Sequence, residues 1–145
     1  PGLPKISIPT TIVEFNGLQG DYNNIRTEKK KGNLDRAVSI MTIDKINDLR
    51  SEGWPIRLGD LGENFMVQGV DYDYFKIGGE YNMGKKVRIK ISEPCNPCTR
   101  LSVLPYVGEE RINEFMRTLI HRRGWYARVL DEGEVGLFDK IKRTL

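Results

Sequence analysis

The sequence predicts a β-rich fold, mainly β with a few helices, and three observations support this. Short segments in which apolar and polar residues alternate recur along the chain, and a period of two is the spacing of half-buried strands. Gly, Pro, Asn or Asp bounds most of these segments, as in the turns of a barrel or sandwich. Two segments show helical spacing instead. We therefore expect one domain over residues 1–145, built as a β-barrel or sandwich with helices.

The clearest strand pattern is KKVRIKISE at 85–93, where three β-branched residues alternate with polar ones. Shorter segments of the same kind, in chain order, are KISIP, TTIVEF, RAVSIM, NFMVQG, YFKIG, RLSVL, WYARVL and FDKIK. We expect each of them to form a strand. The chain has no repeat of fixed period, which excludes a solenoid.

The helical segments are 42–53 and 109–124. In the first, Thr42 can cap the helix and Gly53 can end it. In the second, EERINEFMRTLIHRRG, apolar residues recur at i, i+3, i+4, i+7 and i+8 before a basic C-terminal end that complements the helix dipole. His121, the only histidine, falls opposite this apolar stripe, so we expect it in solvent. The sequence therefore offers no good candidate for a Cys-His or Ser-His pair.

The composition limits the possible partners. The chain is 39% hydrophobic and 30% charged, and it has no apolar run of the eighteen or so residues that a membrane span needs. Its net charge of +3 is too small for a typical nucleic-acid binder, although it suits an anionic small molecule. The N-terminus lacks the features of a secretory signal. We expect a soluble, cytoplasmic protein with free thiols and with neither a nucleic acid nor a membrane as partner.

The only cysteines, Cys95 and Cys98, lie in EPCNPC at 93–98. A structural zinc site needs four Cys or His ligands, which one pair and a remote His121 do not supply. A thioredoxin-like pair has its first cysteine at a helix N-terminus, whereas the residues after Cys98 predict a strand. The proline-rich turn instead delivers Cys98 at a fixed place, where its thiolate can ligate a soft metal or attack an electrophilic sulfur. The alternative is that Cys98 is a small buried apolar residue.

Two further loops are candidates for binding. In GDLGENFMVQG at 59–69, the glycines can bring backbone amides and the Asn64 side chain close to a ligand. The alternative is a turn that only caps the following strand. RTEKKKGNLDR at 26–36 concentrates basic residues, which is equally typical of a solvated surface loop. Neither loop alone identifies a function.

Taken in order, the motifs resemble one family. The segments are GLPK, GLQGD, KGNLDRAV, LGDLGENFMVQG, IGGEYNMGKKVRIKISEPCNPCTRL and RGWYARVLDEGEV. In sequence and spacing they resemble the MOSC domain, the C-terminal module of molybdenum cofactor sulfurases, over nearly the whole chain. The resemblance implies a MOSC-type β-barrel, similar to the β-barrel of pyruvate kinase, which binds the molybdenum–molybdopterin cofactor and uses one cysteine as metal ligand or sulfur carrier.

The family pattern also implies site residues. The cysteine that follows proline falls on Cys98, as the catalytic thiol and the ligand of molybdenum. The groups that the matched loops supply to the cofactor are Lys5, Lys31, Asp35, Arg36 and Asn64. Arginine can hold a phosphate with two hydrogen bonds, and Asp35 could orient Arg36 or accept from the pterin. Cys95 stands where relatives often carry another residue, so its role is open.

One motif departs from the family. Members commonly have HGG before DRAV, whereas this chain has KGN, with Lys31 at the histidine position. A lysine near neutrality neither accepts a hydrogen bond nor shuttles a proton as imidazole does. The resemblance therefore gives no support to an activity that needs that histidine, although Lys31 still favours an anion.

Three hypotheses follow, and whether the protein is an enzyme stays open. The first is a cofactor-binding protein that, in an enzymatic version, reduces N-hydroxylated compounds with electrons from a partner protein. The second is a non-enzymatic carrier that delivers sulfur or cofactor to a molybdoenzyme. The third is a C-x-x-C thiol redox protein that uses both Cys95 and Cys98, which predicts a reversible disulfide.

Overall fold

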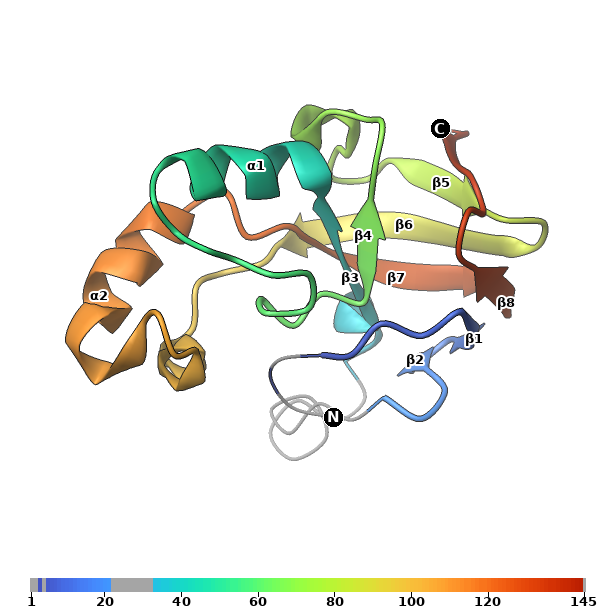
Figure 1. Ribbon diagram of the computed structural model, residues 1–145. Helices are drawn as coiled ribbons and strands as arrows, with labels where there is room; N and C mark the ends of the chain where they lie inside the picture. The colour runs from blue at the N-terminus through green and yellow to red at the C-terminus, as the bar shows by residue number, and fades with distance from the viewer. Residues whose placement is uncertain (1–2, 4, 22–32, 145) are drawn as a thin grey trace.

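The computed structural model describes residues 3, 5–21 and 33–144. Its elements, shown in Figure 1, are β1 (Thr10–Glu14), β2 (Gly17–Leu18), the 3-10 helix η2 (Leu34–Arg36), β3 (Val38–Thr42), α1 (Ile43–Ser51), β4 (Phe65–Val67), η3 (Tyr72–Tyr74), β5 (Glu80–Met83), β6 (Val87–Pro94), η4 (Thr99–Val103), α2 (Gly108–Leu119), β7 (Trp125–Asp131), β8 (Gly133–Gly136) and β9 (Ile141–Arg143). The prediction of a mainly β fold with a few helices is confirmed.

In the described residues the strands form two sheets. One has six strands in the order β4-β3-β7-β6-β5-β9, and the other has three in the order β2-β1-β8. Strands β3 and β4 pair in parallel, and the remaining ladders are antiparallel. Only Glu132 separates β7 from β8, so the chain passes directly from the larger sheet into the smaller one. The result is a curled sheet, a half-barrel, with α1 and α2 at one end (Figure 1).

The period of two in β6 explains one side of the core. Val87, Ile89 and Ile91 are buried, and they pack with Ala127 and Val129 of the neighbouring strand β7. Burial of each β-branched side chain contributes about 2 kcal/mol. The residues between them point to the outer face of the sheet, which therefore can carry polar groups.

A second apolar cluster lies between the helices. The residues of α2 with helical spacing, Ile112, Phe115 and Leu119, pack against Ile46 and Leu49 of α1. Neither helix has the length and apolarity that crossing a membrane requires, and this holds for the described part of the chain.

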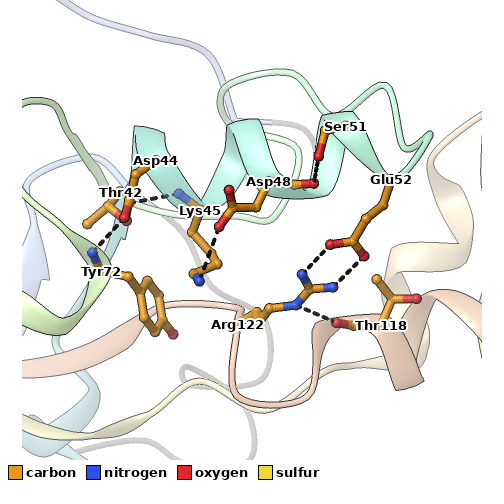
Figure 2. A network of polar contacts seen from close by, with 9 residues as sticks. All are labelled: Thr42, Asp44, Lys45, Asp48, Ser51, Glu52, Tyr72, Thr118 and Arg122. Atoms are coloured by element: carbon orange, nitrogen blue, oxygen red, sulfur yellow. Dashed lines mark hydrogen bonds and ion pairs between the residues drawn. The ribbon is translucent and has the colours of Figure 1, made fainter.

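Polar contacts fix the start of α1 (Figure 2). Thr42 is the N-cap, as predicted, but its hydroxyl donates to the Asp44 carboxylate and accepts no hydrogen bond from the helix backbone. Asp44 also accepts from the backbone amides of Lys45, at 2.7 Å, and Tyr72, at 2.9 Å. Burial would raise the pKa of Asp44, but the hydrogen bonds outweigh it and the pKa lies below 3.8. The contacts tie α1 to η3.

A pair of charged residues joins the two helices at their far ends. Arg122 donates through Nη1 and Nη2 to the two carboxylate oxygens of Glu52, at 2.6 and 2.7 Å, and through Nε to the carbonyl oxygen of Thr118 (Figure 2). We call the Glu52–Arg122 pair the helix clamp. His121, next to it, is exposed as predicted, with a φ of 62° just beyond the last turn of α2.

Three strand predictions were wrong. RLSVL forms η4, whose N-cap is Cys98. YFKIG forms the end of η3 and a turn, because the hydroxyl of Tyr81 accepts from the Lys76 amide and donates to the Tyr74 carbonyl, which curls this segment. KISIP has no strand partner among the described residues, and its Lys5 amide bonds to the Gly59 carbonyl at 2.9 Å. Apolar content alone misled each of these predictions, since it does not distinguish a ladder from a packed loop.

Candidate functional site

The two cysteines occupy different environments at the end of β6. The Cys95 amide donates to the carbonyl oxygen of Gly124 at 2.8 Å, and only 5% of Cys95 is exposed. Cys98 is partly exposed at the exit of the turn, and its Sγ accepts from the Arg100 amide at 3.5 Å. Both thiols are free. We call residues 95–98 the cysteine turn.

Burial separates the chemistry of the two thiols. Burial raises the pKa of Cys95 to about 12, although the charges of Arg123 and Arg36 lower it in part. Cys95 is therefore protonated near neutrality, and a protonated thiol is neither a nucleophile nor a metal ligand. The sequence argument that a strand follows Cys98 was wrong, because η4 begins there. Burial of Cys95 now provides the stronger argument against a redox pair.

Arg123 connects the cysteine turn to the loop at 59–64. Its Nη1 donates to the carbonyl oxygen of Asn96 at 2.6 Å, and its Nη2 donates to that of Leu61 at 3.0 Å. Within the described part of the chain, no carboxylate forms an ion pair with Arg123. Carbonyl oxygens satisfy hydrogen bonds without cancelling charge. Arg123 thus brings a positive charge to the turn that carries Cys98.

A second arginine lies on the outer face of the sheet. The guanidinium of Arg36 donates from Nε to Oε1 of Glu93 at 2.6 Å, and it stacks over the ring of Tyr126 at 5.0 Å. Ladder register places Ser39, Tyr126 and Glu93 opposite one another across β3, β7 and β6. Residues directly opposite in antiparallel strands share a face. The row therefore leads across the sheet to the cysteine turn.

A β-bulge adjusts this row. The register of β6 against β7 shifts between Ile91 and Glu93, which leaves Ser92 as the extra residue. The Ser92 hydroxyl lies within hydrogen-bond distance of the carbonyl oxygens of Asp35 and Tyr126. Bulges redirect side chains at sheet edges and near active sites. Here the bulge ties η2, which carries Arg36, to the sheet.

A third group of polar residues lies on the other side of the 59–64 loop. Nζ of Lys5 and Nδ2 of Asn64 both donate to Oδ2 of Asp21, at 2.6 and 2.8 Å. Oδ1 of Asn64 accepts from the Ser39 amide at 2.8 Å. Burial would raise the pKa of Asp21, but Lys5 and then Asn64 outweigh it, and the pKa lies below 3.8. This cluster fixes the loop against β3.

The loop itself depends on a buried acid. Glu63 is 8% exposed, and its Oε2 accepts from the Gly59 amide at 2.6 Å. Its Oε1 has no hydrogen-bond partner among the described residues, and burial raises the pKa of this carboxyl. Gly59 has a φ of 92°, and a Cβ there would lie 2.0 Å from the Lys5 carbonyl oxygen. Glycine is required because the loop passes so close to the N-terminal segment.

The structure brings together some of the predicted site residues. Burial and then Cys95 raise the pKa of Tyr126, Arg123 and Arg36 lower it, and Cys98 raises it by the smallest amount. These groups therefore share one electrostatic environment. Lys5 and Asn64 form the neighbouring cluster, joined through the 59–64 loop.

Of the two remaining predicted residues, one lies elsewhere and one is outside the described residues. The carboxylate of Asp35 accepts from Arg128 at 2.8 Å and is exposed, and the carboxylate that holds Arg36 is that of Glu93. Lys31 falls outside the described residues, so its predicted role in cofactor binding stays a prediction.

Sequence reasoning missed Glu93, Arg123 and Tyr126 as members of the site. Arg123 lies in HRRG, a basic helix end that by itself suggests a partner of the helix dipole. The residue in the sequence that could have indicated the position of Arg123 is Gly124, which follows it. Gly124 has a φ of 105°, and a Cβ there would lie 2.3 Å from the Ile40 carbonyl oxygen, so a turn at this point can aim Arg123 away from α2.

The donor set limits what kind of metal centre could form. No group of three or more His, Cys, Asp or Glu residues within residues 3, 5–21 and 33–144 could hold a metal ion. The cysteine turn offers one accessible thiol with two cations close by. This set fits a metal that arrives with its own ligands on an anionic carrier, and to which the protein adds one sulfur at most.

Comparisons with known proteins agree with the fold. The model of the MOSC domain family matches residues 27–142. A protein of Gibberella moniliformis named "Reductase" is 31% identical over 129 residues, which are 86% of this chain and 22% of that protein. The chain thus spans about a fifth of this relative's length.

Solved structures show the same fold. YuaD from Bacillus subtilis superposes with a TM-score of 0.75 at 21% identity, over 94% of this chain and 85% of that one. YiiM from Escherichia coli gives 0.71 at 18%, over 99% and 67%. YiiM from Geobacillus stearothermophilus gives 0.63 at 22%, over 77% and 55%. The expected MOSC-type fold is confirmed.

Proposed function

The chain belongs to the MOSC domain family, and we propose that it binds the molybdenum cofactor with Cys98 as metal ligand or sulfur carrier. The observation that carries this proposal is the contact of Arg123 with the cysteine turn. Its guanidinium holds the Asn96 carbonyl oxygen at 2.6 Å and has no carboxylate partner in the described residues. A positive charge and an accessible thiol therefore share one turn.

Each residue has a separate task in this proposal. Cys98 supplies the one sulfur of the protein, since burial keeps Cys95 protonated. Arg123 and Arg36 attract the phosphate of the pterin, because guanidinium groups bind phosphate with paired hydrogen bonds. Asn64 and Lys5 hold the adjoining loop through Asp21. When bound, the cofactor would supply a redox-active metal, which the described residues do not provide.

Two versions of this function differ in turnover. In the first, the protein reduces N-hydroxylated substrates with electrons from a partner protein, and the relative named "Reductase" favours this version. In the second, it carries sulfur or cofactor to a molybdoenzyme. In both versions we place the protein, as a single MOSC domain, in the cytoplasm, where a reducing environment keeps both thiols free.

Metal and pterin analysis tests the proposal. We would purify the wild type, Cys98→Ser and Cys95→Ser from a host that makes molybdenum cofactor. We expect molybdenum and pterin in the wild type and in Cys95→Ser. In Cys98→Ser we expect a loss of about tenfold or more, since losing even an outer partner of a metal ligand costs that much. Absence of molybdenum from all three, with a control protein loaded in the same host, would overturn the proposal.

A turnover assay separates the two versions. Loaded protein would be given an N-hydroxylated substrate and a reduced electron donor. Product formation that disappears in Cys98→Ser supports the reductase, whereas stable retention of cofactor without product supports the carrier. Mass spectrometry across a range of redox poise tests the thiol-redox alternative, which requires a Cys95–Cys98 disulfide.

A further inference from the structure

The turn after β8 holds an aromatic residue in an unfavourable backbone conformation. The Asp139 amide donates to the Gly136 carbonyl oxygen at 3.2 Å, which closes a turn over 136–139. Phe138, its third residue, has a φ of 72°, a value that Gly or Asn normally supplies at this position. A bulky residue there costs about 1–3 kcal/mol.

Packing against the described residues does not offset this cost. Phe138 is 98% exposed and the preceding residue, Leu137, is 57% exposed. The Leu137 amide bonds to the Pro9 carbonyl oxygen at 2.9 Å, which places the exposed Ile8 beside it. Single exposed apolar residues are ordinary, but adjacent ones on a strained turn indicate a contact surface.

Three exposed lysines lie on this turn's exit and on the turn beside it. The Gly84 amide donates to the Lys140 carbonyl oxygen at 2.9 Å, so the β5–β6 turn lies against this one. Lys85, Lys86 and Lys140 are exposed. The only acid in 136–140 is Asp139, and its Oδ2 accepts from the Gly136 amide at 2.8 Å. We call Leu137, Phe138 and these three lysines the β8–β9 tip.

The β8–β9 tip is remote from the cysteine turn. Strand β6 begins beside the tip and ends at Pro94, immediately before Cys95. Eight strand residues span about 25 Å. In Figure 1 the β5–β6 turn and β8 lie at the end of the sheet opposite to the end of β6. A partner at the tip would therefore leave Cys98 accessible.

We propose that the β8–β9 tip docks on an anionic membrane surface, with Phe138 and Leu137 in the interface and the lysines at the headgroups. An exposed aromatic residue with exposed lysines on its own turn and on the turn beside it has the chemistry of an interfacial anchor. A second copy of the chain is a poor occupant, because the two sets of lysines would repel. Such peripheral contact needs no membrane span, and the composition gave no reason to expect it.

Vesicle sedimentation tests this proposal. The probes are vesicles of phosphatidylcholine alone and vesicles with roughly one third phosphatidylserine. We expect binding to the anionic vesicles that weakens with added salt, and a partition coefficient about tenfold lower for Phe138→Gly. Lys85→Glu with Lys86→Glu should lower the partition coefficient similarly on anionic vesicles. No binding of wild type, or equal binding to both vesicle types, would overturn the proposal and leave an acidic protein surface as the other class of partner.

The Phe138 variant carries its own folding control. Glycine favours a φ of 72°, so Phe138→Gly should unfold at the same temperature as wild type or higher while losing vesicle binding. Phe138→Asn, which also tolerates this conformation, repeats the test if the glycine variant unfolds early. Ile120→Ser removes an exposed apolar residue at the other end of the molecule and should bind as wild type does. Equal loss in Ile120→Ser would contradict the assignment to the tip.

Discussion

Two adjacent arginines, Arg122 and Arg123, have different partners, and we assign a structural role to the first and a binding role to the second. Arg122 forms the helix clamp, with both oxygens of Glu52 at 2.6 and 2.7 Å. Arg123 contacts the carbonyl oxygens of Asn96 and Leu61. The first guanidinium is neutralised by a carboxylate, whereas the second keeps its charge beside the cysteine turn.

The two neighbouring arginines thus serve two regions, the helix clamp and the cysteine turn. At the clamp, hydrogen bonding from Arg122 is the main cause that lowers the pKa of Glu52, and the pair is exposed. Exposed ion pairs contribute little to stability. At the cysteine turn, Arg123 is surrounded by carbonyl oxygens, which orient a cation and leave it able to attract an anion. Of these two adjacent arginines, Arg123 is the one to which we assign a ligand.

The largest effect is expected from changing the glycine that follows the two arginines. Gly124 has a φ of 105°, and a Cβ there would lie 2.3 Å from the Ile40 carbonyl oxygen. We expect Gly124→Ala to lower the free energy of unfolding by about 3 kcal/mol, from backbone strain and a clash with the sheet. Urea denaturation measures this. Gly78→Ala, at a φ of 83° with open space around it, is the control and should cost less. Equal costs would show that the close approach is unimportant.

Removing the carboxylate of Glu93 should increase the attraction of Arg36 for an anion. Glu93 accepts from Arg36 at 2.6 Å, so Glu93→Gln removes that negative charge from beside the guanidinium. We expect the affinity for inorganic phosphate, measured by calorimetry, to rise about threefold to tenfold. Asp131→Asn, which removes one of the two carboxylates that pair with Arg88 in the same sheet and leaves Glu80 in place, is the control and should leave phosphate affinity unchanged. A higher phosphate affinity in Asp131→Asn but not in Glu93→Gln would show that the anion does not bind at Arg36.

Acid should loosen the 59–64 loop. Asp21 has a folded pKa below its ordinary 3.8 because Lys5 and Asn64 donate to it. Such a depressed pKa contributes stability that is present above pH 3.8 and is lost as the pH falls through the folded pKa. Asp21→Asn should therefore cost about 1 kcal/mol at pH 6 and less near pH 3. Urea denaturation at several pH values measures both. A cost that does not change with pH would show that the charge of Asp21 is unimportant.

The smallest effect is expected at the helix clamp. Arg122→Met keeps the apolar stem of the side chain and removes the contact with Glu52, so we expect the melting temperature to fall by at most about 3 °C. The shift should shrink further in high salt, because exposed pairs are screened. A large, salt-independent loss in thermal melts would mean that the clamp holds the helices together.

The sequence was most informative where one physical pattern dominated. Alternation in 85–93 located β6, and helical spacing in 109–124 located α2, because burial alone produces those periods. Helix α1 and its N-cap at Thr42 followed from capping chemistry. RLSVL and YFKIG failed because local hydrogen bonds, at the Cys98 cap and the Tyr81 hydroxyl, decided their conformation.

The candidate site was less accessible to sequence reasoning. The turn chemistry marked Cys98, but Arg123 looked like the basic end of a helix and Glu93 like the end of a strand. Their contacts depend on the φ of Gly124 and on the bulge at Ser92, and neither has a reliable single-sequence signature. The contrast between Cys95 and Cys98 likewise depends on burial, which spacing does not reveal.

The most direct test of the account is the molybdenum and pterin content of Arg123→Met measured beside Arg122→Met, both purified from a host that makes the cofactor. We predict that the molybdenum and pterin content of Arg123→Met is about tenfold lower than that of the wild type, the expected cost of removing a charged hydrogen-bond donor from an anion site. Arg122→Met should retain the wild-type content. Equal retention in both variants, or equal loss in both, would contradict the assignment of the anion to Arg123.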